Sequence, residues 1–219
     1  MTAHRGWEET RMEQKELIEQ TLQNLKRNNM DAVYVEDVGQ LREVVRQSIA
    51  AGDTVTFGGS VTLKETGVYD MLRQMGDDGA IDFLDRDLEG ADVQDIYRRA
   101  FCSDVYLTSA NAITKNGWLY NVDGNGNRVA AMIFGPKRVL VIAGCNKIVE
   151  TKEEAQQRVE KIAAPKNAQR LQLDTPCAKT GECMHCMSDQ RICCSYTFLG
   201  KQRIKDRIRV ILVGEPLGY

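Results

Sequence analysis

Five short apolar runs recur along the chain, and segments of helical character separate most of them. Runs of this kind, without polar alternation, predict strands that are covered on both faces, as in a parallel sheet. The intervening segments predict helices that cover that sheet. We therefore expect an α/β fold with a mostly parallel, doubly wound sheet and flanking helices. The five runs are 54–57 (TVTF), 81–84 (IDFL), 104–108 (DVYLT), 138–144 (RVLVIAG) and 207–214 (RIRVILVG).

The remaining segments set the expected domain organisation. Apolar residues at three- and four-residue steps predict an N-terminal helix over residues 1–29. Residues 30–219 then form one α/β domain, and the segment 174–196 within it is a cysteine-rich loop that projects from the sheet. Another helix is expected over 150–163, ended by Pro165.

The composition narrows the class of protein. Hydrophobic residues make up 42% of the chain and charged residues 27%, which is ordinary for a globular protein. A formal charge of −2 gives no reason to expect nucleic acid or an anionic membrane as a partner. The first residues lack the apolar core of a secretory signal, so we expect a cytoplasmic protein. Seven cysteines in a reducing compartment indicate metal or redox chemistry rather than disulfides.

Two glycine-bearing segments follow predicted strands and are candidates for an anion site. In the first, the candidate ligand-binding residues are Gly58, Gly59, Ser60 and Thr62, because glycines let backbone N–H groups turn toward one point and the hydroxyls add donors. The alternative is a tight turn in which Ser60 only caps the next helix. The crevice beyond strand ends is where open α/β sheets bind ligands.

The second segment lies between residues 109 and 128. Its candidates are Asn111, Asp123, Gly124, Gly126 and Arg128, and a cation in the first turn of a helix gains from an anionic ligand. The alternative is a β-hairpin turn at the Asp-Gly pair. Neither segment matches the dinucleotide fingerprint or the P-loop, which argues against a nicotinamide or ATP site of those types.

Four cysteines with the spacing C-x5-C-x2-C-x6-C predict a metal centre: Cys177, Cys183, Cys186 and Cys193, with Cys194 adjacent. Two thiolates separated by two residues grip a metal from a tight turn, and the flanking cysteines complete a set of four. A [4Fe–4S] cluster is favoured slightly over a structural Zn²⁺, although the spacing fits neither standard ferredoxin run. A thioredoxin-like pair would leave two cysteines unused.

These motifs in their order resemble the LUD-domain family of lactate utilisation proteins. The resemblance rests on FGGSVTLKETG, DVYLTSANAITKNGWLYNVDGNGNR, GPKRVLVIAGCNKIV and the closing CAKTGECMHCMSDQRICC...RVILVGEPLGY. It implies a fold similar to ribose-5-phosphate isomerase, glucosamine-phosphate deaminase and the CoA transferases. It also implies a component of L-lactate oxidation that works with iron–sulfur partner proteins. The protein itself could form a homo-oligomer.

The resemblance suggests further site residues and leaves three functions open. Glu65 and Lys64 are candidates for catalytic acid and base, and Lys147 is a candidate ligand-binding residue. The first function is an oxidoreductase component that binds a small anionic organic acid. The second is a non-redox isomerase or CoA-transferase-like enzyme, with a phosphate-bearing or acyl ligand and a structural zinc. The third is a ligand-binding protein without catalysis.

Overall fold

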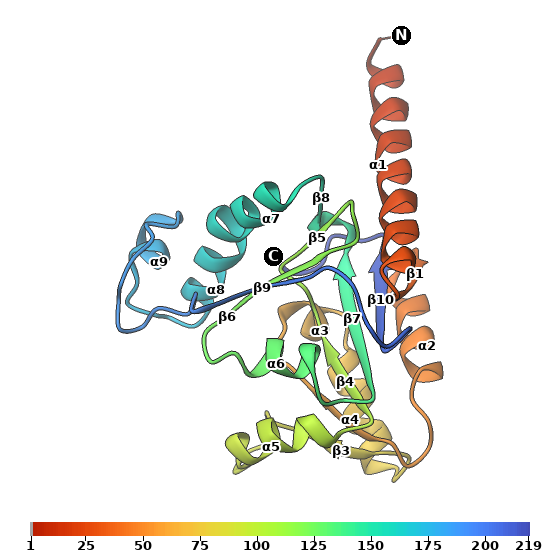
Figure 1. The fold of residues 1–219 in the computed structure, drawn as a ribbon, viewed down its shortest axis with the longest axis vertical. Coiled ribbons are helices and arrows are strands. Elements are labelled where there is room, and N and C mark those ends of the chain that lie inside the picture. Colours follow the sequence, from red (N-terminus) through yellow and green to blue (C-terminus); the bar gives the residue numbers. More distant parts are fainter. Residues whose placement is uncertain (1) are drawn as a thin grey trace.

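The computed structural model describes the backbone of residues 2–219 and the side chains from residue 12 onward. Its central feature is a sheet of six parallel strands in the order β1-β10-β7-β4-β2-β3 (Figure 1). This confirms the expected parallel sheet, and all five apolar runs lie in it. The strands are β1 (Asp31–Val35), β2 (Thr54–Phe57), β3 (Asp82–Leu84), β4 (Val105–Thr108), β7 (Arg138–Gly144) and β10 (Ile208–Val213).

Helices cover both faces of this sheet, so the doubly wound arrangement is also confirmed. In β7, Leu140 and Ile142 pack into a core with α2, α3 and α4, while Val139 and Val141 pack into a second core with α1 and α6. The period-2 alternation of strand side chains thus feeds two separate cores. The helices are α1 (Thr2–Arg27), α2 (Val38–Gln47), α3 (Val61–Glu65), α4 (Val68–Asp77), α5 (Val93–Arg99) and α6 (Asn127–Ile133).

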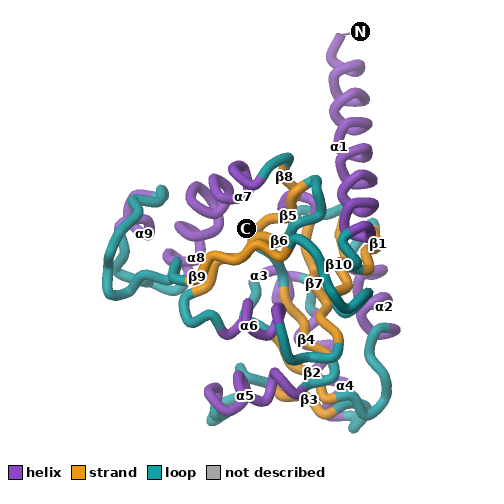
Figure 2. The backbone as a smooth tube through the Cα atoms, in the orientation of Figure 1, coloured by secondary structure: helices purple, strands orange, loops and turns teal. Residues whose placement is uncertain are grey.

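A second sheet of four short strands was not predicted. Its order is β8-β5-β6-β9, and it lies beside the parallel sheet (Figure 2). The β5–β6 hairpin turns at Asn116-Gly117, where Gly117 has φ 74°, and Asn-Gly is a strong hairpin signal. The expected alternative of a hairpin turn at Asp123-Gly124 is wrong, because β6 ends there and α6 follows. The strands are β5 (Ala112–Thr114), β6 (Leu119–Asp123), β8 (Ile148–Val149) and β9 (Ser195–Leu199).

The helix expected to end before Pro165 instead continues to Arg170. It comprises α7 (Lys152–Arg158), a π-helical turn (Val159–Ala163) and α8 (Ala164–Arg170). In a regular α-helix the proline ring clashes with the carbonyl four residues earlier. The π-helical turn, in which Ala164 N donates to Val159 O, changes the backbone directly before the ring. Pro165 therefore sits at the start of α8 rather than beyond the end of a helix.

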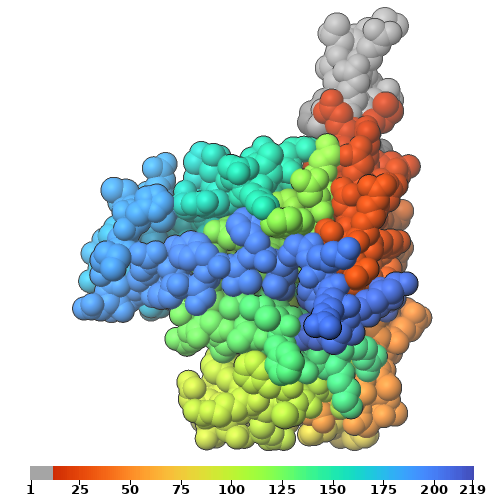
Figure 3. Space-filling view, in the orientation of Figure 1, coloured from red at the N-terminus to blue at the C-terminus, as the bar shows by residue number. Residues whose placement is uncertain are grey.

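The cysteine-rich segment leaves the sheets and returns through β9. After a short 3-10 turn (Cys145–Lys147) and α8, the chain forms α9 (Pro176–Thr180) and then has no helix or strand until β9. In Figure 3 the segment that contains β9 crosses the surface between the region of α7 and α8 and the region of α6. Among the described residues, none of the helices is both long and apolar enough to span a membrane.

Candidate functional site: a cationic cavity and a cysteine pocket

A cavity of about 410 Å³ opens where the strands of both sheets end. The loop after β2, the residues after β4 and the residues after β6 all contribute to its wall. Eight of the ten residues expected to bind a ligand line it: Gly59, Ser60, Thr62, Asn111, Asp123, Gly124, Arg128 and Lys147. The structure thus brings together residues that are separated by up to 88 positions in the sequence. The other two, Gly58 and Gly126, do not line the cavity.

Lys147 is the most buried cation of the cavity, with 3% of its surface exposed. Its Nζ donates to Thr62 Oγ1 at 2.8 Å and to Ser109 Oγ at 3.1 Å. An ammonium group carries three donors, so one remains for a ligand. Within the described part of the chain, Lys147 forms no ion pair with a carboxylate. A buried charge without a counter-charge is unfavourable, and an anionic ligand would supply that counter-charge.

The surroundings of Lys147 are cationic as well as polar. Burial, followed by the nearby guanidinium groups of Arg158 and Arg128, lowers the pKa of Lys147 to about 7. Arg158 is itself 8% exposed and donates to the carbonyl of Asn111 at 2.6 Å, and burial lowers its pKa. Glu65 acts in the opposite direction on Lys147, but its effect is the smallest of the four.

Arg128 is neutralised by the protein rather than left for a ligand. Its Nη2 lies 2.6 Å from Asp123 Oδ1, and both side chains are largely buried. The same guanidinium donates to Ser109 O at 2.8 Å and to Asn121 Oδ1 at 2.6 Å. This network fixes the ends of β4 and β6 relative to α6. Sequence reasoning assigned the unpaired charge to Arg128, whereas the structure assigns it to Lys147.

In the glycine loop after β2, the backbone lies close to neighbouring side chains. A Cβ at Gly58 would lie 2.6 Å from the Tyr106 hydroxyl, so a larger residue does not fit there. Ser60 caps α3, with its hydroxyl accepting from Leu63 N at 3.3 Å, as the alternative interpretation expected. Ser60 also lines the cavity. The capping role is thus observed, and the ligand-binding role of Ser60 stays a prediction. The helices that start at this cavity, α3 and α6, have only 5 and 7 residues.

Lys64 and Glu65, the candidate acid and base, do not line the cavity. Both side chains are exposed on α3. Glu65 Oε2 accepts a hydrogen bond of 2.6 Å from Gly218 N and so holds the C-terminal segment against α3.

Several cavity residues were not found from the sequence. They are Arg86, which follows β3, Tyr97 of α5, Asn167 and Arg170 of α8, Arg191 of the cysteine-rich segment, and Tyr219. Each reaches the cavity through the tertiary fold, without a local motif. Arg170 Nε, for example, donates to the Tyr219 hydroxyl across 49 positions.

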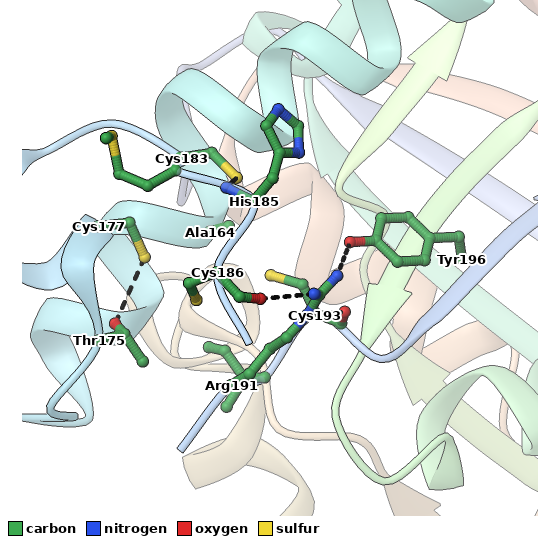
Figure 4. A pocket seen from close by; sticks show the side chains of 11 residues that line it. Ala164, Thr175, Cys177, Cys183, His185, Cys186, Arg191, Cys193 and Tyr196 are labelled. Carbon is green, nitrogen blue, oxygen red and sulfur yellow. Dashed lines mark hydrogen bonds between the residues drawn. The ribbon is translucent and has the colours of Figure 1, made fainter. Parts of the chain in front are cut away.

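The four predicted cysteine ligands line a second pocket. Cys177, Cys183, Cys186 and Cys193 surround it, together with Ala164 of α8 and Tyr196 of β9 (Figure 4). Burial and the neighbouring thiols of the other three cysteines raise the pKa of Cys193 to about 11, with Arg191 acting in the opposite direction. The four thiols therefore interact electrostatically. Cys194 lines the cationic cavity instead, so the two adjacent cysteines lie at different pockets.

The turn from Cys183 to Cys186 is held by a left-handed residue and by two backbone hydrogen bonds. His185 adopts φ 46°, in the left-handed region, and its backbone N donates to Cys183 Sγ at 3.5 Å. Cys183 N donates to Glu160 O of the π-helical turn at 3.1 Å, which anchors this turn to the helix. Non-glycine residues in the left-handed region and π-helical turns are both frequent at functional sites.

Two features of the cysteine pocket bear on what it holds. Among the described residues, no three His, Cys, Asp or Glu side chains are spaced to hold a single metal ion. Around one zinc the sulfurs would lie about 3.8 Å apart, given a Zn–S distance of about 2.3 Å. A four-iron cluster binds each thiolate at a different iron, so its ligands are further apart. The space between the side chains is only about 20 Å³, which is room for about one water-sized group.

The remaining two cysteines lie away from this pocket. Cys145 is buried in the second core, and burial raises the pKa of its thiol to about 11. Cys102 is exposed at the end of the 3-10 turn that follows α5.

The cavity and the cysteine pocket share a wall. Arg191 and Ile192 line both, and Cys194 N donates to Asp123 O at 2.9 Å. Arg191 also holds the cysteine segment together. Its Nη1 donates to Cys186 O at 2.6 Å, and its Nε donates to Cys193 O at 2.8 Å. One side of segment 191–194 thus faces a cationic cavity and the other faces four thiols.

The sequence matches the model of the LUD domain over residues 18–213. The chain belongs to the LUD domain family. This confirms the resemblance and indicates a role in lactate utilisation. The matched LUD domain begins within α1 and ends at the last residue of β10, so it includes the cysteine pocket and every lining residue of the cavity except Tyr219.

Structural comparison supports the fold of this LUD domain. The crystal structure of a DUF162 family protein from Deinococcus radiodurans is similar over 92% of this chain and 98% of that one, with a TM-score of 0.55 and 16% identity. A crystal structure of eIF2B beta from Chaetomium thermophilum matches 53% of this chain and 44% of that one, with a TM-score of 0.39 and 14% identity. The search of curated proteins gives no match.

Proposed function

We propose that this LUD-domain protein is a component of organic-acid oxidation of the L-lactate type. In this proposal the cationic cavity binds the anionic acid, and Cys177, Cys183, Cys186 and Cys193 hold a [4Fe–4S] cluster. Such a cluster supplies electron transfer when bound. Oxidation of a hydroxy acid to a keto acid releases two electrons and two protons; a partner protein with iron–sulfur centres would accept the electrons, and the protons would pass to water.

The observation that carries the anion part is the unpaired charge of Lys147. The side chain is 3% exposed, and its two hydrogen-bond acceptors are hydroxyl groups rather than carboxylates. Among the residues that the structure describes, Asp123 is the one acidic residue of the cavity wall, and it is already paired with Arg128. A carboxylate or phosphate oxygen would form a charge-assisted hydrogen bond with the free donor of Lys147.

The observation that supports the redox part is the shared wall. Because segment 191–194 separates the two pockets, a ligand in the cavity lies close to the proposed cluster. Arg191 would place a positive charge beside both. All four cysteines of the proposed cluster line the one pocket on the far side of this segment.

The direct test is metal analysis of protein prepared without oxygen. We expect a brown protein with broad visible absorbance that contains iron and acid-labile sulfide. Cys186→Ser should lose most of the iron, whereas Cys102→Ser, an exposed cysteine outside the pocket, should retain it. A colourless protein with one zinc would contradict the electron-carrying part. A protein with neither iron nor zinc after anaerobic preparation would contradict the metal centre itself.

A second candidate function is a non-redox enzyme of the isomerase or CoA-transferase type, or a binding protein, with a structural zinc. The small volume of the cysteine pocket, about 20 Å³, favours this alternative because it has room for about one water-sized group. Turnover of a sugar phosphate or an acyl-CoA without an electron acceptor would support it over the oxidoreductase proposal.

A further inference from the structure

Four of the five described cationic residues that line the cavity fall into two sets at different depths, and the fifth, Arg191, is bound to carbonyls of the cysteine-rich segment. Lys147 and Arg128 form the inner set, with 3% of Lys147 and 13% of the Arg128 side chain exposed. Arg86 and Arg170 belong to the outer set: the Arg86 side chain is 21% exposed, and Arg170 is an exposed residue. A single small monoanion that contacts Lys147 would leave the outer set without a ligand.

Arg86 has donors that face no protein acceptor. Its Nε donates to Asp87 at 3.2 Å, while its two terminal nitrogens form no hydrogen bond with the residues that the structure describes. The guanidinium is nevertheless held in place, because it lies 5.1 Å from the centre of the Tyr97 ring and beside Gly59. A side chain at Gly59 would contact Arg86 Nη1 at 3.4 Å, so the glycine leaves space at this point. The two terminal nitrogens of the Arg86 guanidinium are thus held in place and available to donate to a ligand.

The glycine loop relates the two sets of cations. Arg86 lies beside Gly59, and Lys147 bonds to Thr62, three residues further along. Three residues span at most about 10 Å of chain. The two cations therefore contact neighbouring points of one short loop, and a molecule with an anionic group at each end would present one group to each. The cavity of about 410 Å³ is also within the size range of pockets for ligands larger than lactate, about 300–1,000 Å³.

We infer that the cavity takes a ligand with two separated anionic groups, such as a phosphorylated carboxylic acid, with one group at Lys147 and the other at Arg86. This inference rests on the proposed function only in that the cavity binds an anion; it does not depend on the cysteine pocket. Arg86 is then a specificity-determining residue that distinguishes a two-ended anion from a monoanion such as lactate.

The test compares the affinities of 3-phosphoglycerate, glycerate and inorganic phosphate by isothermal titration calorimetry. For the unmodified protein we expect 3-phosphoglycerate to bind at least about tenfold more tightly than either of the other two, because it engages both cation sets. Arg86→Ala should bind 3-phosphoglycerate no more tightly than the better of the other two probes. Arg86→Lys should retain part of the difference in affinity, because lysine keeps the positive charge but not the forked guanidinium donors. Arg98→Ala removes an exposed arginine outside the cavity and should change nothing.

The outcomes separate the inference from the proposal on which it rests. Equal affinities for 3-phosphoglycerate and for the better of the two fragments, unaffected by Arg86→Ala, would overturn the two-ended ligand but leave an anion site. The absence of binding for all three probes, or binding that Lys147→Met does not weaken, would overturn the anion site and the inference together.

Discussion

The two pockets of this LUD-domain protein differ in how the fold supports them. The cationic cavity is built at the ends of β2, β4 and β6, and the bonds of Arg128 and Asp123 tie the ends of β4 and β6 to α6. The cysteine pocket is built from a segment that contains only α9 before it reaches β9. We infer that the cavity exists before its ligand arrives, whereas the cysteine pocket depends on a metal centre for its final shape.

The largest effect is expected when the frame of the cavity is broken. Asp123→Asn leaves the charge of Arg128 without its carboxylate, and loss of one partner of a largely buried pair costs about 3–5 kcal/mol. The measurement is the free energy of unfolding in urea. Asp95→Asn is the control, because its pair with Arg99 is exposed and should cost less than about 0.5 kcal/mol. Equal losses in the two variants would mean that this pair does not support the fold.

The next effect separates ligand binding from stability. Lys147→Met removes a buried ammonium whose pKa falls from 10.5 to about 7 on folding. The unfolded chain binds the proton of the Lys147 ammonium more tightly than the folded chain does. The charged Lys147 therefore lowers the free energy of unfolding by its full amount below about pH 7, and this destabilisation decreases as the pH rises toward 10.5. The variant should therefore gain roughly 2–4 kcal/mol of unfolding free energy near pH 6 and less near pH 10. It should also lose anion binding. If Lys147→Met instead lowered the free energy of unfolding at both pH values, the conclusion that Lys147 carries an unpaired buried charge would be contradicted.

The same group sets the pH dependence of anion binding. Below about pH 7 Lys147 is already protonated, so affinity should be constant; above it, affinity should fall by up to about tenfold per pH unit because binding must first protonate the amine. Sulfate is the suitable probe, since it does not titrate in this range. The Lys147→Met variant should show no such dependence. A flat profile for the unmodified protein would contradict a role for Lys147 in binding.

The smallest effect concerns Ser60, which has a structural role and lies at the cavity. Ser60→Ala removes the cap of α3 and should cost about 1 kcal/mol. Thr151→Ala removes the equivalent cap of α7 at a distance from the cavity and should cost about the same. If sulfate affinity falls only in Ser60→Ala, its hydroxyl contacts the ligand. If sulfate affinity falls in neither variant, Ser60 acts only as a cap.

The sequence was most informative where local pattern and tertiary structure coincide. The strand at Thr54–Phe57 and the strand at Arg138–Gly144 have the predicted bounds, because apolar runs of this kind fit a strand covered on both faces. The glycine loop at a strand end was also identifiable. The second sheet was missed although Asn116-Gly117 signals its hairpin, because its strands are only 2 to 5 residues long.

The charge balance of the cavity could not be derived from the sequence. Arg128 was the evident cation because it follows a glycine motif, yet its partner Asp123 is set by the way β6 leads into α6. Lys147 acquires its importance from burial and from Thr62, 85 positions away. Arg86 and Arg170 carry no motif at all. Such residues become functional only through packing between distant segments.

Hydrogen–deuterium exchange on anaerobically prepared protein, before and after removal of the metal with a chelator, tests the difference between the two pockets most directly. We predict that amides of residues 181–194 lose protection when the metal is removed, while amides of β4, β6 and β7 around the cavity keep theirs. Unchanged protection of residues 181–194, or an equal loss of protection in the strands that frame the cavity, would contradict the proposed difference between the two pockets.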